Sequence, residues 1–521
     1  MDPRQKFIDY INRGYEFRGD SFVLGTAMLD GEPVSGTLVK LPLSTMNRHG
    51  LISGATGTGK TKTLQVIAEN LSEKGIPVML MDVKGDLSGL AMPGNINKHI
   101  ENRHKSIGIE WEAKGFPLEF LSLSGEKGVR LRATVSEFGP ILFSKILELN
   151  DTQAGVVSLI FKYCDDNNLP LLDLKDFRKA VQYLTTDGKK EIESEYGRIS
   201  TASIGAILRK LVELEQQGAE VFFGETSFEV SDLLTYSNDG RGVISILRLT
   251  DIQDRPKLFS TFMLSLLAEI YSSFPEEGDL EKPKLAIFID EAHLVFDEAS
   301  DALLDQIETV IKLIRSKGVG IFFCTQTPKD IPDPVLSQLG LKIQHALRAF
   351  TAKDRKAIKL VAENYPVSVF YETDELITSL GIGEALVTAL NEKGIPTPLS
   401  ATLLRAPMSR MDVLTEKEIN KMTSSSKLAK KYNTHIDRES AYELLTAKIE
   451  FRKKQEEELE KETINKRYTL GKSDSPILDR TLQRQVGRTI ARELTRGILG
   501  VLGIGGKTGR TKSISKIKGW F

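Results

Sequence analysis

The stretch LISGATGTGKTKTL, residues 51–64, decides the fold of this chain. An apolar strand pattern leads into a glycine-rich turn that matches GxxxxGK[ST], and a helical pattern follows over residues 60–73. Glycine lets the backbone curl until several N–H groups point inward, and the helix start adds partial positive charge. We therefore expect a phosphate-binding loop, formed by Gly54, Ala55, Thr56, Gly57, Thr58, Gly59, Lys60 and Thr61.

Two side chains at the end of this loop suit a nucleoside triphosphate bound with Mg²⁺. The Lys60 ammonium is expected to reach the β- and γ-phosphates, and the Thr61 hydroxyl is expected to ligate the metal ion. A plain glycine-rich turn is the alternative, but the strand before it and the helix after it favour the nucleotide loop.

The second half of the expected site lies in KLAIFIDEAHLV, residues 284–295. Asp290 ends a fully apolar strand, so its carboxylate should emerge at the edge where α/β sheets bind ligands. Asp290 is expected to hold Mg²⁺ through water, and Glu291 to polarise the attacking water as general base. A helix cap is the alternative role for Asp290. An Asp followed directly by Glu is typical of ATPases that hydrolyse with their own glutamate.

Six further side chains are candidates for the same site. Gln326 follows the next buried strand and is expected to contact the γ-phosphate or the water, unless it is an ordinary loop residue. Asp82, Lys84 and Asp86, in LMDVKGD (residues 80–86), should lie on the same sheet edge, with a solvated loop as the alternative. Arg315 and Arg348 are candidate arginine fingers, supplied by a neighbouring subunit or by a distant loop, although each could instead form a structural salt bridge.

The rest of the chain alternates strand and helix patterns, which predicts an α/β fold with a mainly parallel sheet. The expected divisions are a β-rich segment (1–48), a core in two parts (49–135 and 241–407), a helical insertion (136–240), a polar linker with a charged helix (408–479), and a basic Arg/Gly-rich tail (480–521).

Charge is spread unevenly over this sequence. Residues 480–521 hold ten Lys and Arg against one Glu, whereas the whole chain has a net charge of −1. Arginines at every fourth position from Arg480 to Arg496 would form a cationic stripe on a helix. Such a stripe could bind phosphate backbone, an acidic partner, a membrane surface, or the acidic body of the chain itself.

Two features of the composition bear on location. The two cysteines, Cys164 and Cys324, form no metal-site or disulfide pattern, which favours reduced thiols. No signal peptide or membrane-length apolar run is apparent, so we expect a cytoplasmic protein without a transmembrane segment.

Taken in order, the motifs resemble the HerA–FtsK branch of P-loop ATPases over roughly residues 20–405, and bacterial HerA-like proteins of the YjgR type most closely. The resemblance implies a RecA-like core, the cofactors ATP and Mg²⁺, and a hexameric ring that threads or remodels DNA. It also implies phosphate, metal, water and sensor roles for Lys60, Thr61, Asp290, Glu291 and Gln326. The segments that carry it are NRHGLISGATGTGKT, MDVKGD, IFIDEAHLVFD, IFFCTQTPKDIP and LGIGEALV.

Two other functions remain open at this stage. The chain could be a non-motor ATPase switch that recruits a protein partner through the basic tail. Alternatively, DEAH (residues 290–293) could be a helicase box between two RecA-like lobes, with QRQVGR (residues 483–488) as its arginine motif. The DNA form, the polarity of movement, unwinding as opposed to translocation, the pathway and the partner are not encoded in these motifs.

Overall fold

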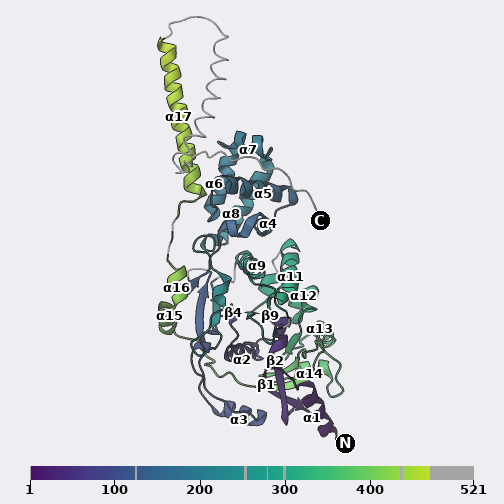
Figure 1. The fold of residues 1–521 in the computed structure, drawn as a ribbon. Coiled ribbons are helices and arrows are strands. Elements are labelled where there is room, and N and C mark those ends of the chain that lie inside the picture. Colours follow the sequence, from purple (N-terminus) through teal and green to yellow (C-terminus); the bar gives the residue numbers. More distant parts are fainter. Residues whose placement is uncertain are drawn as a thin grey trace, which may run out of the picture. The chain divides into compact units, whose positions relative to one another are not determined.

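One twelve-stranded sheet organises the part of the chain that this computed structural model describes, residues 2–469 without 124–125, 252–254, 279, 297–300, 435 and 437 (Figure 1). Its order is β2-β1-β12-β11-β10-β3-β9-β8-β4-β7-β5-β6. The strands are β1 (Ser21–Leu29), β2 (Glu32–Pro42), β3 (Gly50–Ser53), β4 (Val78–Asp82), β5 (Leu118–Ser122), β6 (Val129–Arg130), β7 (Ile244–Arg248), β8 (Leu285–Ile289), β9 (Val319–Thr325), β10 (Leu341–Gln344), β11 (Glu384–Thr388) and β12 (Ser400–Leu404).

The strands from β10 to β6 all run parallel, which confirms the predicted mainly parallel α/β sheet. Every residue of β3, β4, β8 and β9 is buried, as expected where helices cover both faces of a parallel sheet. Because these strands are parallel, their carboxyl ends meet at one edge, and the segments that follow β3, β4, β8 and β9 lie there together.

The other strands, β2, β1, β12 and β11, pair antiparallel and extend the same sheet. The N-terminal β-rich segment is therefore continuous with the core: Gly25 of β1 pairs with Leu404 of β12. A Cβ at Gly25 would lie 2.1 Å from the carbonyl oxygen of Leu403, so only glycine permits the two strands to approach this closely. All described strands belong to one sheet, which differs from the two RecA-like lobes of the helicase-box alternative.

Helices connect and cover the strands, and α4 to α8 group as a cluster of their own (Figure 1). Polar residues begin three of these helices, because Thr134, Asn150 and Asp173 form capping boxes at the N-termini of α4, α5 and α6. The helices are α1 (Pro3–Gly14), α2 (Lys60–Glu73), α3 (Lys98–Ile107), α4 (Val135–Ile146), α5 (Asp151–Asp166), α6 (Leu174–Thr185), α7 (Lys189–Glu195), α8 (Thr201–Gln216), α9 (Pro256–Ser273), α10 (His293–Phe296), α11 (Asp301–Ile314), α12 (Asp333–Leu336), α13 (Ala352–Ala362), α14 (Thr373–Ser379), α15 (Glu416–Ser425), α16 (Lys427–Tyr432) and α17 (Ala441–Thr469).

The stretch expected to be a polar linker instead begins with two short helices. Thr415 and Glu418 form a capping box that starts α15, and the Ser426 hydroxyl accepts a hydrogen bond from the backbone of α16. These local caps give helical structure to a sequence with few apolar residues. The basic tail with Arg480 to Arg496 lies outside the described residues. No helix in the described ranges is both long and apolar enough to cross a membrane.

Candidate functional site

The loop between β3 and α2 has the backbone that its glycines predicted. Gly54, Gly57 and Gly59 have φ values of 150°, 79° and 112°, which side chains other than glycine rarely adopt. A Cβ at Gly54 would lie 2.5 Å from the Cβ of His345, whereas one at Gly57 would meet no atom within 4 Å. The loop therefore needs glycine for close packing at its start and for conformation at its middle.

Lys60 is buried at the end of this loop and bonds to the loop itself. Its ammonium donates to the carbonyl of Gly54 at 2.6 Å and to that of Ala55 at 3.3 Å. Burial lowers the pKa of Lys60. The Thr58 hydroxyl also donates to the Ala55 carbonyl, at 2.7 Å. The cation is thus held over the loop, whereas the Thr61 side chain, the expected metal ligand, is partly exposed at the start of α2.

A buried histidine, His345, packs against the phosphate loop and α2. His345 follows β10, and its ring Nε2 lies 3.0 Å from the Thr63 hydroxyl on α2. Its backbone N–H donates to the carbonyl of Ser53, and the N–H of Ala55 donates to Ala346 at 2.8 Å. Burial lowers the pKa of His345 to about 4, so the ring is neutral near pH 7. The sequence offered no sign of this role, because a lone histidine after a strand has no distinctive pattern.

The segment LGIGEALV also reaches the loop. The Gly383 N–H donates to the carbonyl of Thr58 at 3.0 Å. Arg103 of α3 in turn donates to the carbonyls of Ile382, Gly383 and Leu404. In the sequence, this segment was only one of the motifs that carry the family resemblance. The fold shows that it contacts the phosphate loop.

Asp290 and Glu291 lie at the same sheet edge, directly after β8. Both are buried, and one oxygen of each, Asp290 Oδ2 and Glu291 Oε2, has no hydrogen-bond partner. Burial raises the pKa of Asp290 to about 7, and the nearby Lys84 cation opposes that rise. Glu291 has a φ of 47°, a left-handed conformation that is costly for a residue with a side chain and clusters at functional sites.

Lys84 comes from the loop after β4 and forms an ion pair with Glu291. The buried Asp82 shapes that loop, because its carboxylate accepts hydrogen bonds from the N–H groups of Gly85, Asp86 and Leu87 at 2.7 to 3.2 Å. Burial raises the pKa of Asp82 to about 6. On the other side, His293 Nδ1 lies 3.3 Å from Glu291 Oε2. Sequence reasoning had placed Lys84 on this edge without finding its partner.

The oxygens of the Asp290 carboxylate and the Thr61 hydroxyl suit a hydrated Mg²⁺. Hard oxygen ligands, carboxylate and hydroxyl, are what this ion prefers, and it binds through few protein groups while keeping several waters. Asp290 Oδ2 is a buried acceptor without a partner, which is costly unless a cation or its water satisfies it. The Thr61 hydroxyl, the expected hydroxyl ligand, lies at the start of α2 on the same sheet edge as Asp290.

The three remaining candidates differ in position. Gln326 is exposed directly after β9, the strand between β3 and β8, so it lies between the two halves of the site. Arg348 is exposed beyond β10 on the same edge and donates to the carbonyl of Thr378 at 3.3 Å. Arg315 precedes β9 and therefore lies at the opposite edge of the sheet. Arg315 cannot reach the phosphate loop of its own chain, and a finger role would require a neighbouring chain.

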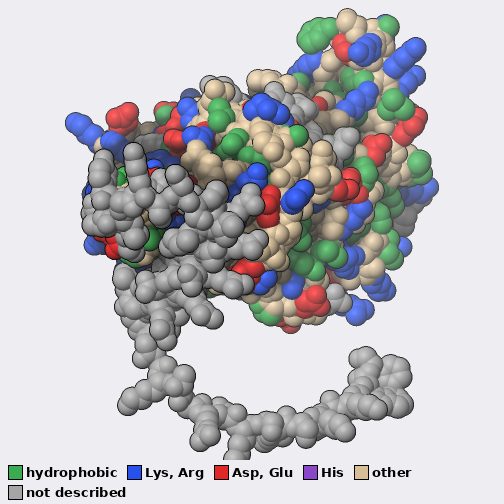
Figure 2. All heavy atoms as spheres, turned by 90° about the horizontal axis from the view of Figure 1, so that it is seen from above, with side chains coloured by type: hydrophobic (Ala, Val, Ile, Leu, Met, Phe, Trp, Pro, Cys, Tyr) green, Lys and Arg blue, Asp and Glu red, His purple; other side chains and the backbone are tan. Residues whose placement is uncertain are grey.

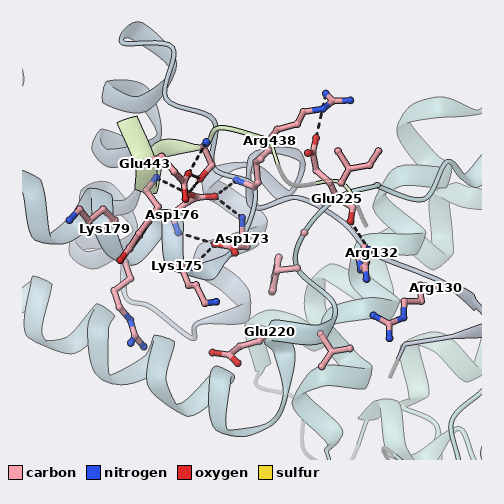
Figure 3. Close-up of a pocket in the computed structure, with 18 of the residues that line it drawn as sticks. Arg130, Arg132, Asp173, Lys175, Asp176, Lys179, Glu220, Glu225, Arg438 and Glu443 are labelled. Atoms are coloured by element: carbon pink, nitrogen blue, oxygen red, sulfur yellow. Dashed lines mark hydrogen bonds and ion pairs between the residues drawn. The ribbon is translucent and has the colours of Figure 1, made fainter. Parts of the chain in front are cut away.

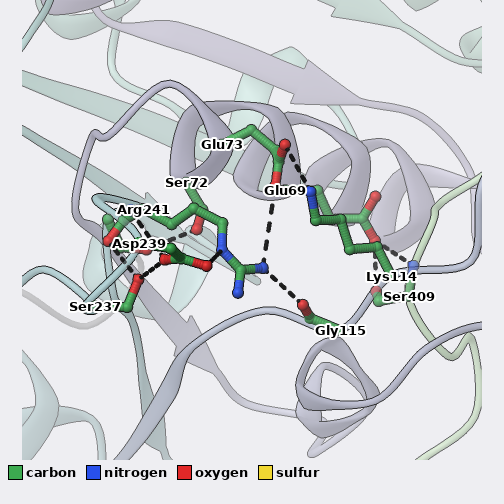
Figure 4. Close-up of polar contacts among 10 residues, drawn as sticks. Glu69, Ser72, Glu73, Lys114, Gly115, Ser237, Asp239, Arg241 and Ser409 are labelled. Atoms are coloured by element: carbon green, nitrogen blue, oxygen red, sulfur yellow. Dashed lines mark hydrogen bonds and ion pairs between the residues drawn. The ribbon is translucent and has the colours of Figure 1, made fainter.

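The far half of α2 is fixed by acidic side chains (Figure 4). Buried Glu69 accepts hydrogen bonds from the N–H groups of Met408 and Ser409 at 2.8 and 3.0 Å, and from the Ser409 hydroxyl. Burial raises the pKa of Glu69 to about 7. Glu73 forms a half-exposed ion pair with Lys114 at 2.9 Å. The helix that follows the phosphate loop is thereby held from its distal end.

Comparison with known proteins places this arrangement in a family. The family model described as "Helicase HerA-like C-terminal" matches residues 28–508. The DNA double-strand break repair helicase HerA of Sulfolobus acidocaldarius is 21% identical over 397 residues, covering 73% of this chain and 69% of that protein. The protein of the same name from Saccharolobus solfataricus is 23% identical over 398 residues, covering 75% and 71%.

The fold also resembles a solved structure. The bacterial conjugative coupling protein TrwBdeltaN70, in its unbound monoclinic form, aligns with a TM-score of 0.50 at 14% sequence identity. The alignment covers 78% of this chain and 95% of that one. At this identity the likeness concerns the fold alone.

Proposed function

This chain belongs to the helicase HerA-like C-terminal family and is a P-loop ATPase, and we propose that it is an ATP-driven motor acting on DNA. The observation that carries the proposal is the meeting of two half-sites at one sheet edge. The phosphate loop with Lys60 follows β3, while the carboxylates of Asp290 and Glu291 follow β8, with only β9 between these strands.

Each residue of the site has a proposed part in hydrolysis. The loop N–H groups and Lys60 bind the phosphates of ATP, with Lys60 exchanging its bonds to the Gly54 and Ala55 carbonyls for phosphate oxygens. Thr61 and Asp290 hold Mg²⁺, which when bound neutralises charge on the phosphates. Glu291 accepts a proton from the attacking water, and Gln326 orients that water.

The proposed polymer is DNA, and two observations support it. The HerA relatives that match most of this chain are named as DNA double-strand break repair helicases. The basic residues 480–521 give the chain a cationic segment that suits a phosphate backbone. By contrast, Lys and Arg are interspersed with Asp and Glu over the face seen in Figure 2, so the described surface there has no uniform positive charge.

We propose a homo-oligomer, and specifically a hexameric ring, in which a neighbouring copy supplies the arginine finger. Arg348 lies exposed on the active edge and Arg315 on the opposite one, so a neighbouring copy could present either to the nucleotide. A cytoplasmic location is part of the same proposal. Both cysteines are buried and free, which suits a reducing compartment.

The test compares ATP hydrolysis by the full chain without nucleic acid and with single-stranded, duplex and forked DNA, alongside native mass. We expect DNA to raise the rate, the mass to be that of a hexamer, and Glu291→Gln to lower turnover by about 10²- to 10⁴-fold. Glu308→Gln is the matched control, because Glu308 pairs with Lys312 on the surface of α11.

Two results would change this proposal. An ATPase whose rate ignores every form of DNA would remove DNA as the substrate. If deletion of residues 480–521 abolished capture of a protein partner while basal hydrolysis and DNA binding stayed intact, the ATPase switch would replace the motor.

A further inference from the structure

A pocket of about 810 Å³ lies away from the phosphate loop, between the helical cluster and the edge of the sheet (Figure 3). Its walls come from the chain after β6, the start of α6, residues 220–225 and the segment before α17. A volume of this size is typical of small-ligand sites, which span roughly 300–1,000 Å³. Its lining is mainly charged, so the charges decide which ligand it would recognise.

Most carboxylates of the pocket are already engaged. Asp173 caps α6 by accepting from the N–H groups of Lys175 and Asp176. Asp176 accepts from Leu172, Asp173 and Tyr442 N–H groups and from the Ser440 hydroxyl. Glu443 accepts from Ser440, and Glu225 faces Arg438 at 3.5 Å. These acids hold the walls together, and the six Lys and Arg residues of the lining outnumber its five acids.

The cations have fewer partners. Among the described residues, neither the Arg130 guanidinium nor the Lys175 ammonium forms a hydrogen bond or an ion pair, and the nearby acid Glu220 is exposed. Arg132 donates to the backbone carbonyl of Glu225 at 2.6 Å, which is a neutral acceptor. Burial and the neighbouring Arg130 cation lower the pKa of Arg132, so two like charges lie close together.

The fold explains this grouping. Arg130 ends β6 and Arg132 follows two residues later, and both side chains line the pocket. Lys175 projects from the first turn of α6, and Figure 3 shows it on the α6 wall with the two arginines on the β6 wall. Three cations from segments far apart in sequence thus surround one space.

An aromatic ring lines the same pocket. Tyr442 is 46% exposed, and the Lys179 ammonium lies 5.3 Å from the centre of its ring. Val221 and Ile436 add exposed apolar surface to the lining. Arginine forks bind phosphate in a bidentate manner, and nucleobases stack on aromatic and apolar side chains.

We propose that this pocket is a second, non-catalytic site that binds phosphate groups of a nucleotide-sized ligand through Arg130, Arg132 and Lys175. The phosphates come from a free nucleotide or from a nucleic-acid strand, whose chemistry at these residues is the same. The site is independent of the proposed ATPase site, because no residue is shared between them.

The experiment uses the full chain with Lys60→Ala, which disables the phosphate loop, and calorimetric titration with ADP, inorganic pyrophosphate and oligo(dT). We expect binding to remain in Lys60→Ala and to weaken about tenfold when Lys175→Glu or Arg130→Glu is added. The matched control is Lys189→Glu, which reverses the charge of an exposed lysine at the start of α7 outside the pocket.

Because Arg132 also bonds to the backbone, Lys175→Glu is the variant that tests charge without disturbing the walls. ADP binding weakened by Lys175→Glu identifies a free nucleotide, whereas oligo(dT) binding alone weakened by that variant identifies a strand. The proposal is overturned if none of the three ligands binds Lys60→Ala, or if Lys175→Glu and Lys189→Glu behave alike. DNA-stimulated hydrolysis is measured separately in the wild-type chain, so the ATPase proposal stands or falls on its own.

Discussion

Lys84 and Glu291 form an ion pair across the sheet edge, one following β4 and the other following the adjacent strand β8. The pair fixes the carboxylate that is proposed to activate water, and the second oxygen of Glu291 lies 3.3 Å from His293 Nδ1. The lysine is therefore a positioning residue in the proposed mechanism.

The first prediction concerns this pair. Lys84→Met should lower kcat about tenfold while leaving the KM for ATP within about threefold, because Glu291 loses its orientation but the phosphate loop is unchanged. Lys84→Arg should recover part of the rate. Steady-state kinetics measure both constants, and a rise in KM at constant kcat would show that Lys84 acts in binding instead.

The second prediction separates two glycines of the phosphate loop. Gly54→Ala places a methyl group 2.5 Å from His345, so we expect loss of nucleotide binding together with a lower melting temperature. Gly57→Ala meets no atom within 4 Å and should cost only the left-handed strain, about 1–2 kcal/mol. Thermal unfolding with and without ATP compares them, and equal effects would contradict the packing argument.

The third prediction contrasts two glutamates of α2. Glu69→Ala leaves the Met408 and Ser409 donors without an acceptor in a buried position, which should destabilise the fold by about 2–4 kcal/mol. Glu73→Ala removes a partly exposed ion pair with Lys114 and a 4.0 Å contact with Arg241, and should cost at most about 1 kcal/mol. Denaturant unfolding measures both free energies, and a smaller loss of stability for Glu69→Ala than for Glu73→Ala would contradict a stabilising role for the hydrogen bonds to Glu69.

The fourth prediction is a pH dependence at Glu69. Its pKa rises from 4.5 to about 7 on folding, so the folded state binds the proton more tightly than the unfolded state. The contribution of this group to stability is therefore fully present below pH 4.5 and is lost as the pH rises to about 7. Wild type should therefore lose unfolding free energy relative to the uncharged Glu69→Gln variant as the pH rises over that interval. A constant difference would place Glu69 at its ordinary pKa.

Much of the site was readable from local sequence. The glycines of residues 54–59, the lysine after them and the apolar strand ending in Asp290 each carry their own pattern, because backbone conformation and burial are determined within a few residues. The mainly parallel sheet followed from alternating strand and helix periods. The roles of Lys60, Thr61, Asp290, Glu291 and Gln326 stay predictions until variants are measured.

Other features could not be read in this way. The expected linker contains α15 and α16, because caps at Thr415 and Ser426 outweighed a polar composition. The N-terminal strands joined the main sheet through β12, a pairing between residues nearly at opposite ends of the core. Arg315 proved to lie on the edge away from the phosphate loop, which depends on strand direction within the sheet.

The sequence by itself determined that this chain has a phosphate loop, a strand ending in two carboxylates and an α/β fold, because these are encoded by short-range spacing. Tertiary structure alone decided that Lys84 pairs with Glu291, that His345 and Gly383 brace the loop, and that Arg130, Arg132 and Lys175 surround one pocket. The reason is that strand order and helix packing, which bring distant segments together, depend on long-range burial and pairing that no local pattern specifies.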